Sequence, residues 1–395
     1  MKYAIVIPDG AADVPLDELG GKTPLQAARK PHMDWLAAHG RCGLVRTIPP
    51  DMDPGSDVAI MSLLGYDPRQ FYTGRAPLEA AARGLSLAHD EWVFRCNFVT
   101  IIDGRMEDHS AGHISTEEGA ALIAELNRVI ARERIRFYPG VSYRHLMTLQ
   151  GEVSVKTTPP HDILGQPIAP HMPTGPGSEI LCTLIQRSEA VLAGHEVNQV
   201  RRDLNENPAT HIWLWGQGKM PELPSFADRF GRTGAVVAAV DLVRGLAKLI
   251  GWQCIDVPGA TGYLDTNYAG KAQGAIEALG QYDVVAVHVE APDEAGHQGD
   301  AAAKVHAIEQ IDRHIVGPVL EHLRGLGQPW RMLVMPDHAT PCTRRTHLPE
   351  PVPFAMAGEG ISSVVALDFT EAAAAQSDLH VDRGWELMEY FLRKA

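Results

Sequence analysis

The sequence predicts an α/β protein built on a mainly parallel central sheet that is flanked by helices. Short apolar runs with the character of buried strands alternate with longer segments of helical spacing. The first run, residues 3–7, is continuously apolar, as buried parallel strands are, and it ends in a Pro-Asp-Gly turn. The chain has 395 residues, 45% hydrophobic and 21% charged, so it carries enough apolar material for more than one core.

The expected elements follow one another along the chain as strands and helices do in parallel sheets. Apolar residues at helical spacing predict a helix over residues 24–39, and a short helix is expected over 57–64, opened by Gly55 and Ser56. Further strands are expected at 211–215, 283–289 and 332–335, each running into a turn that contains Gly or Asp. Helices are expected at 235–249 and 301–323.

The middle of the chain differs from both ends in its pattern of expected elements and in its composition. It contains expected strands at 93–102 and 153–157, an expected helix at 116–132 and a stretch rich in Pro, Gly and His at 159–177. We therefore predict a discontinuous core domain, residues 1–78 and 208–395, with a smaller α+β domain, residues 79–207, inserted into it. A single larger α/β domain with long loops is the alternative, but loops beyond about 15 residues are uncommon in compact domains.

Charge and composition exclude several function classes. The formal net charge of −14 argues against a nucleic-acid partner held by bulk electrostatics. No apolar run is long enough for a membrane span or a signal peptide, so no membrane partner is expected. The five cysteines are scattered and form no CxxC pair, which predicts a reduced, cytoplasmic compartment.

Metal-type ligands stand where several of the expected strands end. They are Asp9, Asp293, His297, Asp337, His338 and, further along, His347. Ligands bind outside the carboxyl ends of parallel strands because the loops converge there. Three Asp and three His suit one or two divalent ions such as Mn²⁺, Zn²⁺ or Mg²⁺. Each residue alone has a structural explanation, such as a turn at Asp9 or a helix cap at Asp293, but together they form an uncommon pattern.

Ser56 stands at the expected start of a helix and has two interpretations. As a favoured capping residue, it could simply close the first turn. The same position offers unpaired N–H groups and positive potential to a phosphoryl oxygen. A serine hydroxyl becomes a good nucleophile once a metal or a base removes its proton, so Ser56 is also a candidate nucleophile.

Several cationic and polar residues could hold an anionic substrate. The candidates are Tyr72, Thr73, Arg75, Arg83, Asp108, His109, Ser110, Ser142, Tyr143, Arg144, His145 and Lys271, with His161 and Asp162 weaker. The sequence has no phosphate-binding loop of the G-x-x-x-x-G-K-[ST] type and no dinucleotide fingerprint. No G-x-S-x-G elbow surrounds Ser56, which disfavours an ordinary Ser-His-Asp hydrolase.

In combination, these motifs resemble one known family. Pro8-Asp9-Gly10, Asp337-His338, His347 and Asp293-x-x-x-His297 resemble the cofactor-independent phosphoglycerate mutases, as do Pro54-Gly55-Ser56-Asp57, Gly65-Tyr66-Asp67-Pro68 and Tyr72-Thr73-Gly74-Arg75. The match is to the archaeal-type branch with bacterial members, within the alkaline phosphatase superfamily, and it spans nearly the whole chain.

The resemblance implies an alkaline-phosphatase-like core that holds two divalent metal ions, with an inserted substrate-binding lid domain. Asp293, His297 and His347 would hold one ion, and Asp9, Ser56, Asp337 and His338 the other, with Ser56 as the nucleophile. The implied substrate-binding residues are His109, Arg144, His145, Lys271 and Arg75.

The implied reaction interconverts 3-phosphoglycerate and 2-phosphoglycerate through phosphoserine, with no bisphosphoglycerate and no nucleotide. The expected partner is therefore a small phosphorylated carboxylate. A homoserine kinase-like phosphotransferase and a metal-dependent phosphatase or phosphodiesterase are alternatives within the superfamily. A metal-binding regulatory or scaffold protein without catalysis is a third. The identity of the metal and the oligomeric state stay open.

Overall fold

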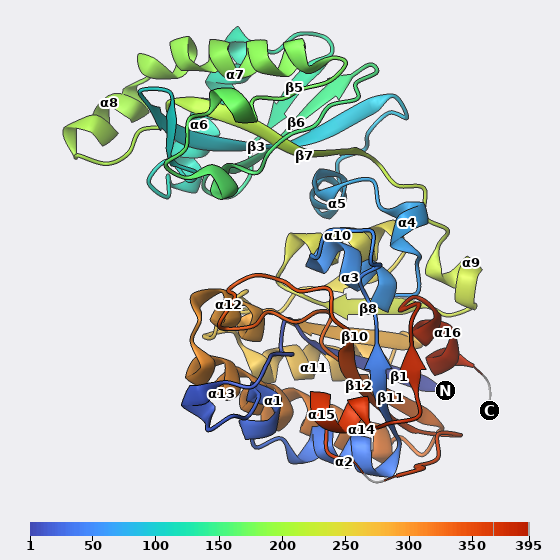
Figure 1. The fold of residues 1–395 in the computed structure, drawn as a ribbon. Coiled ribbons are helices and arrows are strands. Elements are labelled where there is room, and N and C mark those ends of the chain that lie inside the picture. The colour runs from blue at the N-terminus through green and yellow to red at the C-terminus, as the bar shows by residue number, and fades with distance from the viewer. Residues whose placement is uncertain (366, 394–395) are drawn as a thin grey trace. The chain divides into compact units, whose positions relative to one another are not determined.

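The computed structural model describes residues 1–365 and 367–393, and the chain divides into two compact units (Figure 1). The first unit comprises Met1–Tyr72 and Glu222–Ala395, and the second comprises Thr73–Pro221. These boundaries differ from the sequence-based ones, which lie at residues 79 and 207. Helix α5 (Arg75–Ala82) and strand β7 (His211–Lys219) therefore belong to the second unit.

An eight-stranded sheet forms the centre of the first unit. Strand β1 (Lys2–Pro8) lies between β10 (Val284–Val289) and β11 (Trp330–Val334), and both pairings are parallel. The full order is β13-β2-β12-β11-β1-β10-β8-β9. The outer strands are β13 (His380–Val381), β2 (Arg41–Val45), β12 (Val352–Gly358), β8 (Gly234–Val237) and β9 (Gln253–Ile255). Strand β12 runs antiparallel to both of its neighbours and every other pairing is parallel, which confirms the predicted α/β class.

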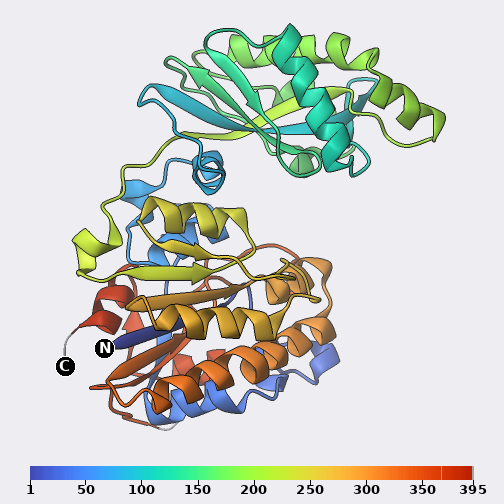
Figure 2. The same ribbon diagram turned by 180° about the vertical axis from the view of Figure 1, so that it is seen from behind.

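Helices cover both faces of this sheet. Side chains such as Ala4 and Val6 share one core with α2 (Pro31–His39), α11 (Tyr268–Leu279), α13 (Ala301–Ile311) and α14 (Gly317–Gly325). Figure 2 shows this layer, with α13 and α14 in orange. On the other face Tyr3 packs edge-on against Phe391 of α16 (Glu386–Leu392). There α3 (Ser56–Leu63) contacts both α16 and α10 (Asp241–Leu249).

The second unit is built on an antiparallel sheet. Strand β3 (Glu91–Ile102) pairs with β6 (Arg144–Gln150) on one side and with β7 on the other, and its end pairs with β4 (Arg105–Asp108). Strand β5 (Ile135–Tyr138) extends the sheet beyond β6. Apolar residues of these strands form a separate core with α6 (Thr116–Val129) and α7 (Ser178–Ala193).

The remaining elements are short or peripheral. They are α1 (Pro24–Ala27), α4 (Pro68–Phe71), α8 (Glu196–Asp203), α9 (Phe226–Phe230), α12 (Ala291–Gln298) and α15 (Glu371–Ala375), single turns at Asp17–Leu19, Pro160–Ile163 and Ala169–His171, and a π-helical segment, Asp312–Val316, between α13 and α14. None of the helices among the described residues has the length and apolar character that spanning a membrane requires.

Several expected elements are wrong in detail. The helix expected over residues 24–39 is two helices, because Pro31 restricts the backbone of Lys30 before it and starts α2. The helix expected over 235–249 begins as strand β8, because its valines pack well in a buried strand. The strand expected over 153–157 is absent, and only Lys156 makes an isolated bridge there. The run at 211–215 is not a strand of the parallel sheet but part of antiparallel β7.

Candidate active site

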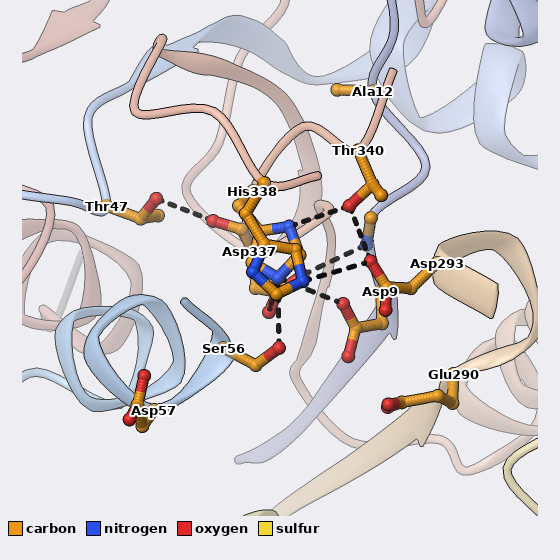
Figure 3. Close-up of polar contacts among 12 residues, drawn as sticks. Asp9, Ala12, Thr47, Ser56, Asp57, Glu290, Asp293, Asp337, His338 and Thr340 are labelled. Atoms are coloured by element: carbon orange, nitrogen blue, oxygen red, sulfur yellow. Dashed lines mark hydrogen bonds and ion pairs between the residues drawn. The ribbon is translucent and has the colours of Figure 1, made fainter. Parts of the chain in front are cut away.

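The candidate ligands gather at the carboxyl ends of three neighbouring strands. Asp9 directly follows β1, and Asp337 lies three residues beyond β11. On the other side of β1, strand β10 runs into α12, which carries Asp293 in its first turn and His297 one turn later. Because β1 lies between β10 and β11, Asp9 stands between the ligands that follow those two strands (Figure 3).

The first group of candidate ligands consists of Asp293, His297 and His347. The Nε2 atoms of the two histidines are 3.0 Å apart. His297 Nε2 lies 3.2 Å from Asp293 Oδ2, and His347 Nε2 lies 3.6 Å from Asp293 Oδ1. The Nδ1 atom of His297 lies 3.0 Å from the carbonyl oxygen of Arg345, which can only accept a hydrogen bond. Nε2 of His297 is thus the ring nitrogen that is turned toward the group, as in a metal ligand.

The second group consists of Asp9, Asp337, His338 and Ser56. Ser56 Oγ lies 2.9 Å from His338 Nε2 (Figure 3). The same Nε2 atom is 3.4 Å from Asp9 Oδ1 and 3.3 Å from Asp337 Oδ2. Asp9 and Asp337 are completely buried, yet these two carboxylate oxygens have no hydrogen-bond partner among the described residues. Buried carboxylate oxygens are costly without a donor or a cation, so this donor set fits a divalent ion.

Ser56 is the first residue of α3 rather than its cap. Gly55 occupies the N-cap position in an extended conformation, and no side chain caps this helix. The capping interpretation of Ser56 is therefore wrong. The hydroxyl is turned instead toward Nε2 of His338.

The electrostatics of the site favour a bound cation. Burial, followed by carboxylates such as Asp337, raises the pKa of Asp9 well above its ordinary value. Burial opposes ionisation of Asp293 as well, but hydrogen bonds from His297 and His347 hold the pKa of Asp293 well below its ordinary value. The hydrogen bond to Asp293 in turn raises the pKa of His297 to about 9. Carboxylates thus crowd together in a buried space, and positive charge would stabilise them.

Two residues near Asp9, His288 and Glu290, were not predicted from the sequence as site residues. His288 Nε2 is 2.8 Å from Asp9 Oδ2 and 3.7 Å from Glu290 Oε2. These three residues form a further group with metal-ligand spacing. Burial raises the pKa of Glu290 to about 7. These two residues could have been predicted from the sequence, because they form a polar pair, His288-x-Glu290, at the end of an otherwise apolar strand.

Gly10 allows Asp293 to approach β1 closely, and we expect Gly10→Ala to damage the site. Gly10 has φ +61, and an added Cβ would lie 2.6 Å from Asp293 Oδ1 and 2.7 Å from Thr340 Oγ1. Strain at such a φ costs about 1–3 kcal/mol by itself, and the clash would also displace Asp293. The kcat and the Mn²⁺ affinity of Gly10→Ala should both fall at least about tenfold.

Gly20→Ala is the matched control for that substitution. Gly20 has a similar φ of +66, but an added Cβ would meet no atom within 4 Å. This variant should lose stability while keeping the metal affinity of the parent protein. Equal metal affinity in both variants would contradict the role given to Gly10.

In the second unit, several candidate substrate-binding residues lie around aromatic rings. The rings of His109 and Tyr143 are 5.8 Å apart, and the guanidinium of Arg144 also lies 5.8 Å from the Tyr143 ring. His161, a weak candidate from sequence, has its ring 6.2 Å from that of His109 and 5.4 Å from that of Trp215. These contacts form a cluster of cationic and aromatic side chains that could receive an anion.

Arg95 belongs to this cluster, although no motif singled it out. Its guanidinium lies 4.1 Å from the Trp215 ring, and its Nε atom is 3.2 Å from Glu79 Oε1. Arg75 reaches the same carboxylate oxygen at 3.7 Å. Arg95 lies within strand β3, and its charge is visible in the sequence, but only the pairing of β3 with β7 brings it to Trp215.

Two candidate substrate-binding residues are buried. His145 packs against Phe98 and accepts a hydrogen bond from the Gly140 N–H at 2.9 Å, and burial lowers its pKa to about 3. Lys271, in the first unit, donates from Nζ to the carbonyl oxygen of His288 at 3.0 Å. Burial lowers the pKa of Lys271 to about 8. Both residues are held by the protein's own backbone groups, unlike Arg144, which is exposed.

Comparison with known proteins gives one consistent family. The sequence profile described as 2,3-bisphosphoglycerate-independent phosphoglycerate mutase matches residues 37–198. The chain is 51% identical to the protein of that name from Methanothrix thermoacetophila, over 99% of this chain and 100% of that protein.

Two solved structures resemble the whole chain. The structure of PH0037 from Pyrococcus horikoshii has a TM-score of 0.84 and 30% identity, covering 99% of this chain and 96% of that one. The structure of a cofactor-independent phosphoglycerate mutase from Thermoplasma acidophilum has a TM-score of 0.68 and 28% identity, covering 99% of each chain.

Proposed function

The chain belongs to the family of 2,3-bisphosphoglycerate-independent phosphoglycerate mutases, and from this premise we propose that it interconverts 3-phosphoglycerate and 2-phosphoglycerate through a phosphoserine at Ser56. One observation carries the proposal. Ser56 Oγ lies 2.9 Å from His338 Nε2, beside buried carboxylate oxygens of Asp9 and Asp337 that have no partner among the described residues.

The proposed reaction has two phosphoryl transfers. In the first, Ser56 Oγ loses its proton and forms a bond to phosphorus while the bond between phosphorus and the substrate oxygen breaks, and that oxygen takes up a proton. In the second, the other hydroxyl of glycerate loses its proton and takes the phosphoryl group from Ser56, and Ser56 Oγ takes up a proton again. Atoms and charges therefore balance without a second phosphate donor.

Two divalent ions fit this chemistry. Asp293, His297 and His347 would hold one ion, and Asp9, Ser56, Asp337 and His338 the other. When bound, such ions lower the pKa of the serine hydroxyl and neutralise charge on the transferring phosphoryl group. The chain itself places Ser56 at the start of α3, where unpaired N–H groups and the helix dipole favour a phosphoryl oxygen.

The second unit is proposed to bind the carboxylate of the substrate. Its candidate residues are Arg75, Arg95 and Arg144, which supply positive charge within an acidic protein, and His109 and His161. Burial lowers the pKa of both histidines, so they would contribute as neutral hydrogen-bonding groups. The reaction also requires that glycerate is retained and water excluded while Ser56 is phosphorylated, since water would release free phosphate instead. We assign this lid role to the second unit.

Purified protein tests the proposal directly. Each phosphoglycerate is incubated with the enzyme and Mn²⁺ in the absence of bisphosphoglycerate, and both isomers and free phosphate are measured. Isomerisation faster than phosphate release is the expected result. Phosphate release faster than isomerisation would instead indicate a phosphatase, and ATP-dependent phosphorylation of homoserine without isomerisation would indicate the kinase-like activity.

Arg144→Met is expected to raise the KM for the substrate more than it lowers kcat. Arg144 is exposed beside Tyr143, so its loss should leave folding intact but remove a charge-assisted contact to the substrate. Such contacts are worth about 1.5–3 kcal/mol, so KM should rise about tenfold or more while kcat changes less. Arg136→Met, an exposed substitution on strand β5, is the control and should leave KM unchanged.

A further inference from the structure

Thr340 lies between ligands of the two proposed metal centres. It is completely buried, and its hydroxyl donates to Asp293 Oδ1. The same Oγ1 atom lies 3.1 Å from His338 Nδ1 (Figure 3). Asp293 belongs to the first group of ligands and His338 to the second. A single hydroxyl therefore joins the two groups.

The hydroxyl proton determines which nitrogen of His338 carries hydrogen. A threonine hydroxyl has one proton, and here it is donated to Asp293, whose carboxylate only accepts. Toward His338 the hydroxyl can offer only a lone pair, so Nδ1 must carry the hydrogen. The lone pair of Nε2 then faces Ser56 Oγ and Asp9 Oδ1. Only this tautomer can bind a cation through Nε2.

His297 shows the same arrangement with a different partner. Its Nδ1 atom faces the carbonyl oxygen of Arg345 at 3.0 Å, so Nδ1–H donates there and Nε2 is the nitrogen left to bind a cation. A backbone carbonyl cannot be removed by substitution. For His338 the corresponding partner is the side chain of Thr340, which can be changed one group at a time.

We infer that Thr340 is a positioning residue that holds His338 in its metal-binding tautomer and couples the two metal sites through Asp293. The backbone of Thr340 is itself fixed, because its N–H donates to the Ala12 carbonyl at 3.2 Å and its carbonyl accepts from Lys304 Nζ at 2.8 Å. The inference rests on the proposed two-metal function, which it deepens by naming the residue that prepares the second site.

Thr340→Val and Thr340→Ser separate the hydroxyl from the shape of the side chain. Valine has almost the same shape without the hydroxyl, and serine keeps the hydroxyl. Chelator-treated proteins are titrated with Mn²⁺ by calorimetry. Thr340→Val should bind Mn²⁺ about 10- to 100-fold more weakly at the site that contains His338, whereas Thr340→Ser should stay close to the parent protein. In ¹⁵N NMR spectra, the His338 ring nitrogens should report loss of the single tautomer only in Thr340→Val.

Thr23→Val is the matched control. Thr23 is also buried in the first unit, and its hydroxyl donates to Glu371 Oε2 at 2.7 Å, away from the candidate ligands. This variant should lose stability but keep full Mn²⁺ affinity. Thr340→Ala provides a second hydroxyl-free variant that adds no bulk, in case valine prevents folding.

Two results would overturn the inference alone: parental Mn²⁺ affinity in the hydroxyl-free variants, or an equal loss in Thr340→Ser. Failure of the parent protein to bind any of Mn²⁺, Zn²⁺ and Mg²⁺ would overturn the proposed two-metal site, and this inference with it. The parent protein therefore distinguishes failure of the proposed function from failure of the role of Thr340.

Discussion

Replacing Ser56 with alanine is expected to abolish isomerisation while leaving the metal content nearly unchanged. The proposed route forms a covalent bond to Ser56 Oγ, so no other group can carry the phosphoryl between the two hydroxyls of glycerate. Loss of a nucleophile of this kind costs more than about 1,000-fold in kcat. The ligands Asp9, Asp337 and His338 remain in place, so metal analysis of the purified variant should stay close to that of the parent protein.

Ser62→Ala is the control for this substitution. Ser62 lies on the same helix, α3, and is buried, and its Oγ has no hydrogen-bond partner among the described residues. A coupled assay should therefore show near-parental turnover for Ser62→Ala and none for Ser56→Ala. Parental turnover in Ser56→Ala would rule out the covalent route.

Removal of divalent ions is the second change for which a large effect is expected. A chelator should abolish isomerisation, and added Mn²⁺, Zn²⁺ or Mg²⁺ should restore it to different extents. The reason is electrostatic, because Asp9, Asp293 and Asp337 crowd together in a buried space and would lack counterions. A ligand present at 100 times its Kd stabilises the folded state by about 2.7 kcal/mol, so chelation should also lower the Tm.

The Tm measurement gives a test that does not depend on turnover. Ser56→Ala should still gain Tm when Mn²⁺ is added, since most of the proposed ligands are intact. Asp293→Asn should gain less, because it replaces a charged candidate ligand with a neutral amide. Full activity of the parent protein after exhaustive chelation would contradict the two-metal proposal.

The parallel fold was predictable because its signal is local. Buried strands such as β1 are continuously apolar, and their ends carry Asp9, Asp293 and Asp337, so strand pattern and ligand type pointed to the same edge of one sheet. Individual elements were predicted wrongly where the local sequence pattern and the tertiary packing favour different structures. The first part of strand β7, residues 211–215, is mostly apolar like a buried parallel strand, and only its long-range pairing with β3 assigns it to the antiparallel sheet.

Three residues near the candidate sites were not predicted from the sequence. His288, Thr340 and Arg95 belong to no recognisable motif, and each has a partner far away in the chain. His288 meets Asp9 across two adjacent strands, and Arg95 meets Trp215 across the pairing of β3 with β7. The sequence likewise offered a cap or a nucleophile for Ser56, and the helix boundary at Gly55 excluded the cap.

By itself, the sequence determined the fold class, the family resemblance and the chemical types available for a metal site, because these depend on composition, periodicity and short motifs. Only the tertiary structure decided which atoms face one another. Hydrogen bonds and metal coordination act over about 3 Å and depend on direction, whereas a motif specifies neither distance nor orientation. The proton of Thr340, the lone pair of His338 and the hydroxyl of Ser56 are therefore related only through the folded chain.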